Sequence, residues 1–103
     1  MKIIKEISEM IVDELEGAEE YVEHALRCKE NHPALARVFY EISLQEMNHV
    51  NMLHTEVAKI IEHHRKEHGE PPAAMMAVYD YLHEKHIKKA AEIKVLQAHY
   101  RGE

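Results

Sequence analysis

The chain has 103 residues, of which 46% are hydrophobic and 31% charged, and its net charge is −6 with histidine neutral. This composition is typical of one small helical domain and excludes a disordered or membrane-spanning chain. An acidic chain argues against nucleic acid as a partner, since phosphate binding needs clustered lysine and arginine, and it favours the binding of cations.

No apolar run approaches the ~20 residues that a transmembrane helix needs. Residues 2–6 lack the continuous apolar core of a signal peptide, so we expect a cytoplasmic protein without a membrane partner. The one cysteine, Cys28, cannot form an internal disulfide and is expected to be a packing residue. The 10 histidines exceed typical usage, and histidine is a common metal ligand.

A first helix is predicted for residues 2–30, because apolar residues recur there in alternating steps of three and four. Gly17 costs ~1 kcal/mol relative to alanine in a helix interior, so we expect a backbone or a ligand to approach it closely. Glu14 stands on the predicted buried face, where an ionised carboxylate is costly unless it is paired or bound to a metal. That face comprises Ile4, Ile7, Ile11, Glu14, Ala18, Tyr21, Ala25 and Cys28.

A second helix is predicted for residues 33–68, opened by Pro33. The short connection before it predicts that the first two helices form an antiparallel hairpin. Two polar residues, Glu46 and His49, stand on its predicted buried face. That face comprises Phe39, Ile42, Glu46, His49, Leu53, Glu56, Ile60 and His63, and it is widened by Leu35, Val38, Val50, Val57 and Ile61.

A third helix is predicted for residues 72–100, after the stop signal of Gly69 and two prolines. Two or three long helices can hardly bury their apolar faces alone, so self-association is expected, with two hairpins forming one four-helix bundle. The third helix carries Met75, Met76, Tyr79, Leu82, His86, Ala90, Ile93 and Leu96 at helical spacing.

Glu14, Glu46 and His49 are predicted to meet at one level of the hairpin. Glu14 lies about as far before the turn as Glu46 lies after it, and His49 follows Glu46 by one helical turn. Di-iron bundles use one glutamate from each of two helices and a Glu-x-x-His pair from each of the other two. One hairpin supplies half of that set, and a two-fold dimer would supply all of it.

Residues 10–57 resemble a ferritin-like half-bundle of the rubrerythrin and encapsulated-ferritin type. The resemblance implies that Glu14, which precedes Tyr21 by seven residues as in the family, is a metal ligand together with Glu46 and His49. These three are then also the expected catalytic residues. It further implies metal uptake at Asp13 and Glu16. The resemblance rests on Asp13-Glu14-Leu15-Glu16-Gly17-Ala18-Glu19-Glu20-Tyr21, on Pro33-x-Leu35, and on Glu46-Met47-Asn48-His49.

From this resemblance we expect a ferroxidase that oxidises Fe(II), with two iron ions per dimer site, O₂ or peroxide as oxidant, and a role in iron detoxification or storage. Manganese and zinc are alternative metals for these ligands. The expected partner is a second copy, with a higher homo-oligomer as an extension. An encapsulin shell is a further partner that the resemblance suggests, although no targeting extension follows the third helix.

Two alternatives to a ferroxidase remain open. The first is a non-enzymatic helical assembly or adaptor protein in which the buried glutamates and His49 only fix the register. The second is a structural zinc-bound dimer with the same ligands. We expect Tyr21 to donate a hydrogen bond to a ligand carboxylate. Two further pairs, Glu56 with His63 and His83 with His86, are weaker candidates for a second site and are expected at the surface, at a bundle end or in interface packing.

Overall fold

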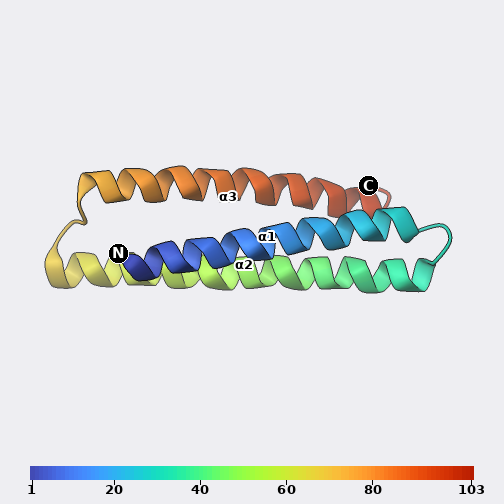
Figure 1. Ribbon diagram of the computed structural model, residues 1–103, viewed down its shortest axis with the longest axis horizontal. Coiled ribbons are helices and arrows are strands. Elements are labelled where there is room, and N and C mark those ends of the chain that lie inside the picture. Colours follow the sequence, from blue (N-terminus) through green and yellow to red (C-terminus); the bar gives the residue numbers. More distant parts are fainter.

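A computed structural model covering residues 1–103 contains three α-helices and no strand. The helices are α1 (Lys2–Cys28), α2 (Pro33–His68) and α3 (Ala73–Tyr100). They run side by side, with the α1–α2 turn at one end of the molecule and the α2–α3 turn at the other (Figure 1). The predicted all-helical fold of three helices is thus confirmed. None of the helices combines the length and the apolar character needed to cross a membrane.

Both turns are set by proline and glycine. Pro33 is the first residue of α2 and follows residues 29–32, a turn short enough to hold α1 and α2 antiparallel. α2 ends at His68 and is followed by Gly69, whose φ of +80° is a left-handed backbone conformation that side-chain-bearing residues rarely adopt. The Gly69 amide donates to the carbonyl oxygen of Arg65 at 3.0 Å and closes the last turn of the helix.

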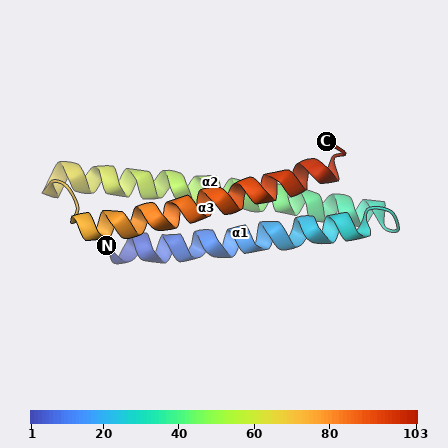
Figure 2. The same ribbon diagram turned by 90° about the horizontal axis from the view of Figure 1, so that it is seen from above.

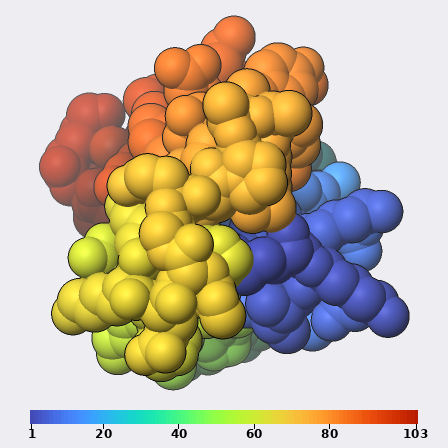
Figure 3. Space-filling model, turned by 90° about the vertical axis from the view of Figure 1, so that its left-hand side faces the viewer, coloured from blue at the N-terminus to red at the C-terminus, as the bar shows by residue number.

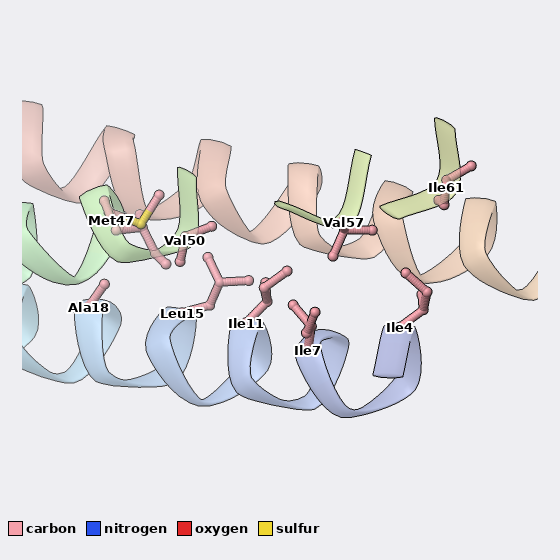
Figure 4. Packing of buried hydrophobic residues seen from close by; sticks show 10 residues of the cluster. Ile4, Ile7, Ile11, Leu15, Ala18, Met47, Val50, Val57 and Ile61 are labelled. Atoms are coloured by element: carbon pink, nitrogen blue, oxygen red, sulfur yellow. The ribbon is translucent and has the colours of Figure 1, made fainter. Parts of the chain in front are cut away.

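The main hydrophobic core lies between α1 and α2 (Figure 4). Ile11 and Val57 are each only 1% exposed, and burial of such a side chain contributes about 1.5–3 kcal/mol to stability. Regular spacing along both helices keeps this core continuous for most of the length of α1. The buried cluster comprises Ile4, Ile7, Ile11, Leu15 and Ala18 of α1, Met47, Val50, Val57 and Ile61 of α2, and Ile93 of α3.

α3 covers one side of the α1–α2 pair (Figure 2), and the three helices form a triangle when the molecule is seen end-on (Figure 3). α3 packs more extensively on α1 than on α2. One buried hydrogen-bond relay joins all three helices. The Ser43 hydroxyl donates to the carbonyl oxygen of Ala18 at 2.7 Å and accepts from Gln97 Nε2 at 3.0 Å.

The buried face of α2 matches the predicted one only in part: Val50, Val57 and Ile61 are buried as expected, but the central stripe is not. The stripe through Glu46 and His49 was expected to be buried, but Glu46 is half-buried and His49 is exposed. The reason is α3, which packs against α1 and α2 and draws the neighbouring stripe of α2 inward. The buried residues of α2 are Ala36, Ser43, Met47, Val50, Val57 and Ile61.

The buried face of α1 is likewise shifted around the helix, so the face predicted for α1 is only partly correct. Glu14 and Tyr21 lie half-buried at its margin, whereas Leu15 and Val22, which the heptad pattern did not include, are buried. Cys28 is also half-buried and has a free thiol, as expected of a packing residue rather than a disulfide. A face that contacts two helices instead of one is wider than a simple heptad stripe.

The side of the α1–α2 pair that lies away from α3 keeps many apolar side chains accessible. The molecule measures 56 × 19 × 17 Å and buries only 18 of its 103 residues, so its core is too thin to cover them. These apolar residues continue the helical stripes that carry Glu14 on α1 and Glu46 and His49 on α2. We call this side the open face; its apolar residues are the exposed Ile3, Met10, Leu35 and Val38 and the half-buried Ile42 and Leu53.

Ser43→Ala is expected to destabilise the chain by about 1–3 kcal/mol, because Gln97 loses its buried hydrogen-bond acceptor. Urea unfolding at one fixed protein concentration measures the effect. Ser8→Ala is the matched control, since Ser8 is also buried but makes no side-chain hydrogen bond in the structure. Equal midpoints for the two variants would contradict a role for the relay.

Candidate metal centre

Glu14, Glu46 and His49 come together near the middle of the open face. Glu14 projects from α1, while Glu46 and His49 lie one turn apart on α2. One potential ligand atom from each residue lies within 4.8 Å of the other two, and His49 Nδ1 is 3.3 Å from Glu14 Oε2. No other three Asp, Glu, His or Cys side chains of the chain converge this closely. The proximity expected from the hairpin register is therefore present.

Gly17 makes room for the Glu46 carboxylate. A Cβ at this position would lie 3.2 Å from Glu46 Oε2 and 3.4 Å from its carboxyl carbon, closer than most real contacts of a Cβ. The close approach that the mid-helix glycine predicts is thus supplied by a side chain of α2, and not by a backbone. The missing methyl group lets a carboxylate from α2 lie against the α1 backbone, one turn from Glu14.

The two carboxyl groups influence each other's protonation. A hydrogen bond with Glu14, together with burial and the negative charge of Glu14, raises the pKa of Glu46 to about 7. The hydrogen bond with Glu46 lowers the pKa of Glu14, and the hydrogen bond and charge of His49 act in the same direction. Such a pair has one carboxyl protonated and one ionised over a wide pH range, because two adjacent carboxylates repel each other.

The group remains accessible from the side away from α3. The His49 side chain is 51% exposed and the Glu14 side chain 28% exposed. A cation could therefore approach from solvent, and a second chain could approach over the same surface. Because carboxylate oxygen and imidazole nitrogen suit Fe(II), Mn(II) and Zn(II), the residues present fit a metal of this class.

The resemblance also suggested supporting residues around the metal ligands, and these form no hydrogen bond with the ligand side chains. Asp13 and Glu16 are both exposed, but Glu16 faces the hollow between α1 and α3 that Lys85 and Lys89 also line, on the side of α1 away from the group. Tyr21 makes no hydrogen bond with either ligand carboxylate, and its ring instead packs 5.9 Å from that of Phe39. The expected hydrogen bond is therefore wrong, since the Tyr21 ring is turned toward Phe39 of α2.

The weaker candidates lie elsewhere. Glu56 is exposed and pairs with Lys59 at 3.3 Å, and His63 is exposed too, so these two form no group. His83 and His86 are not at the surface as a pair: His86 is buried and both rings pack on His54. His54 was missed at the sequence level, although its spacing from Val50 and Val57 puts it on the inward stripe of α2.

One apolar hollow of about 440 Å³ lies at the end of the molecule seen in Figure 3, between the start of α1, the end of α2 and the start of α3. Its walls include Met1, Ile4 and Leu82, and none of the three clustered residues reaches it. It therefore has no part in the centre at Glu14.

Comparisons of the chain with protein-family models, with curated proteins and with solved structures found no match. What the centre can do follows from its residues and their geometry.

Glu46→Gln is expected to remove a pH dependence of stability from the metal-free protein. A pKa raised in the folded state means that the contribution of Glu46 is fully present below its ordinary value near 4.5 and is lost as pH rises through about 7. Glutamine keeps the hydrogen bond to Glu14 without a second charge, so the variant should gain stability relative to wild type between pH 5 and about 8.

Urea unfolding in the presence of a chelator, at several pH values across this range, makes the comparison. Burial lowers the pKa of His54 and His86, which destabilises the fold as pH falls through their ordinary value of 6.5, but both proteins share this effect. It therefore cancels in the difference. Parallel pH profiles for the two proteins would show that no proton is shared.

Proposed function

We propose that this protein is a ferritin-like di-iron protein that oxidises Fe(II) at a centre shared by two copies of the chain. The observation that carries the proposal is the convergence of two carboxylates and one imidazole from both helices of the hairpin, within 4.8 Å and on an accessible face. Their order along the chain, one glutamate on α1 and Glu-x-x-His on α2, is half of the ligand set of a di-iron bundle.

The open face supports the dimer that this function requires. Met10 is 53% exposed and Val38 is 49% exposed, and they lie on the same stripes as the clustered acids. Burying these side chains against a second copy would favour association, since apolar burial contributes ~25 cal/mol per Å². An isologous contact over this face would also bring the two half-sets together, because it presents the same residues twice.

Each residue has a distinct expected role. Glu46 of both copies would be shared between the two metals, and Glu14 together with His49 would complete the ligand set of each metal. Glu46 would release the proton that it shares with Glu14 when a cation binds, because a carboxylate coordinates in its ionised form. A bound pair of iron ions would supply electrons for the reduction of O₂ or peroxide. Fe(II) would also be the substrate, with detoxification, storage or peroxide removal as the purpose.

A second candidate, a helical assembly protein without a metal, is favoured by one observation. Glu14, Glu46 and His49 satisfy one another by hydrogen bonding and proton sharing without any ion. In that case they would fix the register of the helices, as polar residues do in coiled coils. A structural zinc dimer is the intermediate case, with metal bound but without oxidase activity.

Glu46→Ala is expected to reduce Fe(II) oxidation to the rate of a protein-free blank, because it removes the bridging candidate. Anaerobic loading with Fe(II), followed by addition of O₂ and measurement of oxygen consumption, gives the rate. Gln45→Ala is the matched control, since Gln45 is the exposed neighbour on α2 and should leave the rate unchanged. Undiminished oxidation by Glu46→Ala would refute the ferroxidase assignment. Metal uptake without oxidation in wild type would favour the zinc dimer.

Val38→Asp is expected to weaken the dimer strongly, because a charge buried in an apolar contact is costly. Sedimentation equilibrium over a range of concentrations measures the association. Val95→Asp provides the control, since Val95 is 68% exposed on α3 and lies outside the open face. Loss of the dimer with Val95→Asp but not with Val38→Asp would place the interface elsewhere.

A further inference from the structure

Three histidines form a second cluster, between α2 and α3. His54 stands on the inward stripe of α2, and its ring centroid lies 5.0 Å from that of His83 and 5.6 Å from that of His86 on α3. His83 and His86 are one turn apart, so their side chains project from the same side of α3. His86 is only 5% exposed.

Two ring nitrogens of this cluster have no hydrogen-bond partner. These nitrogens are His54 Nε2 and His86 Nε2. No other buried side-chain nitrogen or oxygen atom of the molecule lacks a hydrogen-bond partner. A buried polar atom without a partner costs about 1–3 kcal/mol, and nearly all such atoms in folded proteins are paired. Because both unpaired nitrogens lie in one cluster, they indicate a place where an ion or molecule that binds imidazole nitrogen could be held.

The surroundings favour neutral imidazole rings, the form that binds metals. Burial is the main cause that lowers the pKa of both His54 and His86, and the neighbouring histidines lower it further. None of the three histidines forms an ion pair with a carboxylate; the ring of Tyr79 instead stacks on His83 with centroids 5.7 Å apart. No side chain of the protein therefore competes for these nitrogens.

We propose that His54, His83 and His86 bind a borderline-soft divalent cation, with Zn²⁺ as the first choice. Three imidazoles and a water molecule form a tetrahedral zinc site, and zinc and copper prefer imidazole over carboxylate more than iron does. Binding requires at least one ring to rotate, because the three histidines do not yet have their nitrogens within 4.8 Å of one another. Rotation about a side-chain bond of the half-buried His83 meets this need.

The site would fasten α3 to α2, which α3 contacts less than it contacts α1. Apart from the histidine rings themselves, side-chain links between the two helices include the Ser43–Gln97 hydrogen bond and the stacked rings of Tyr40 and Tyr100 near the end of α3. A cation bound between the helices would stabilise the folded chain by mass action. This site is separate from the open face and does not depend on the proposed ferroxidase function.

The test uses the full chain carrying Glu46→Ala and His49→Ala, which removes the centre on the open face. Titration of this background with Zn²⁺ against a chromogenic chelator should show one tightly bound ion per chain and a raised thermal midpoint. Addition of His86→Gln should weaken binding by roughly 100-fold or more, since one protein ligand is lost. Co²⁺ in place of Zn²⁺ should give the visible absorption of a four-coordinate site.

The matched control is the pair His64→Gln and His68→Gln on α2. These two rings lie 5.1 Å apart outside the core, and they could chelate a metal at helical spacing. Their replacement should leave zinc binding unchanged.

His83→Gln, at a half-buried position, serves as the second ligand variant if His86→Gln unfolds the helices in circular dichroism. Absence of a tight ion in the background protein would overturn the proposal. Unchanged binding after loss of His86 or His83 would do the same, as would binding that disappears with His64 and His68.

Discussion

The short turn between α1 and α2 determines the rest of the structure. With only residues 29–32 to reverse the chain, the two helices must run antiparallel at one register. A shift of one residue would move a side chain by 1.5 Å along the axis and by about 100° around it. That shift would separate Glu14 from Glu46 and would move Ala18 away from the Ser43 hydroxyl. The core and the acidic group therefore depend on the same connection.

The acidic group is tolerated because its charge is balanced locally. The neighbouring Glu14 raises the pKa of Glu46, which favours its neutral form, and the imidazole of His49 lies 3.3 Å from Glu14. In such a group the carboxyl proton and a cation compete for the same oxygens. The absence of a methyl group at Gly17 gives the Glu46 carboxylate its place against α1. Glycine lowers the stability of the helix at position 17 relative to alanine, but it leaves space for the Glu46 carboxylate.

Most of the local architecture could be predicted from the sequence. Pro33 and Gly69 mark the turns through fixed backbone chemistry, and the similar distances of Glu14 and Glu46 from the first turn predict their proximity. The orientation of α2 could not be predicted, since α2 carries two adjacent apolar stripes and periodicity alone cannot decide which one α3 covers. His54 was overlooked for the same reason: a histidine on the second stripe becomes conspicuous only when α3 lies over it.

The one-sided position of α3 has a consequence for assembly. A hairpin of two helices has two broad faces, and α3 occupies one of them (Figure 2). If two copies pair through their hairpins, only the open face is left for that contact, and each chain could then bind one such partner. Two chains that meet there would leave an α3 on each outside surface and no further hairpin face to bind a third chain. Growth beyond a pair would need a chemically different contact, such as one through Val78, Tyr81, Ile87 and Val95, which are exposed on α3.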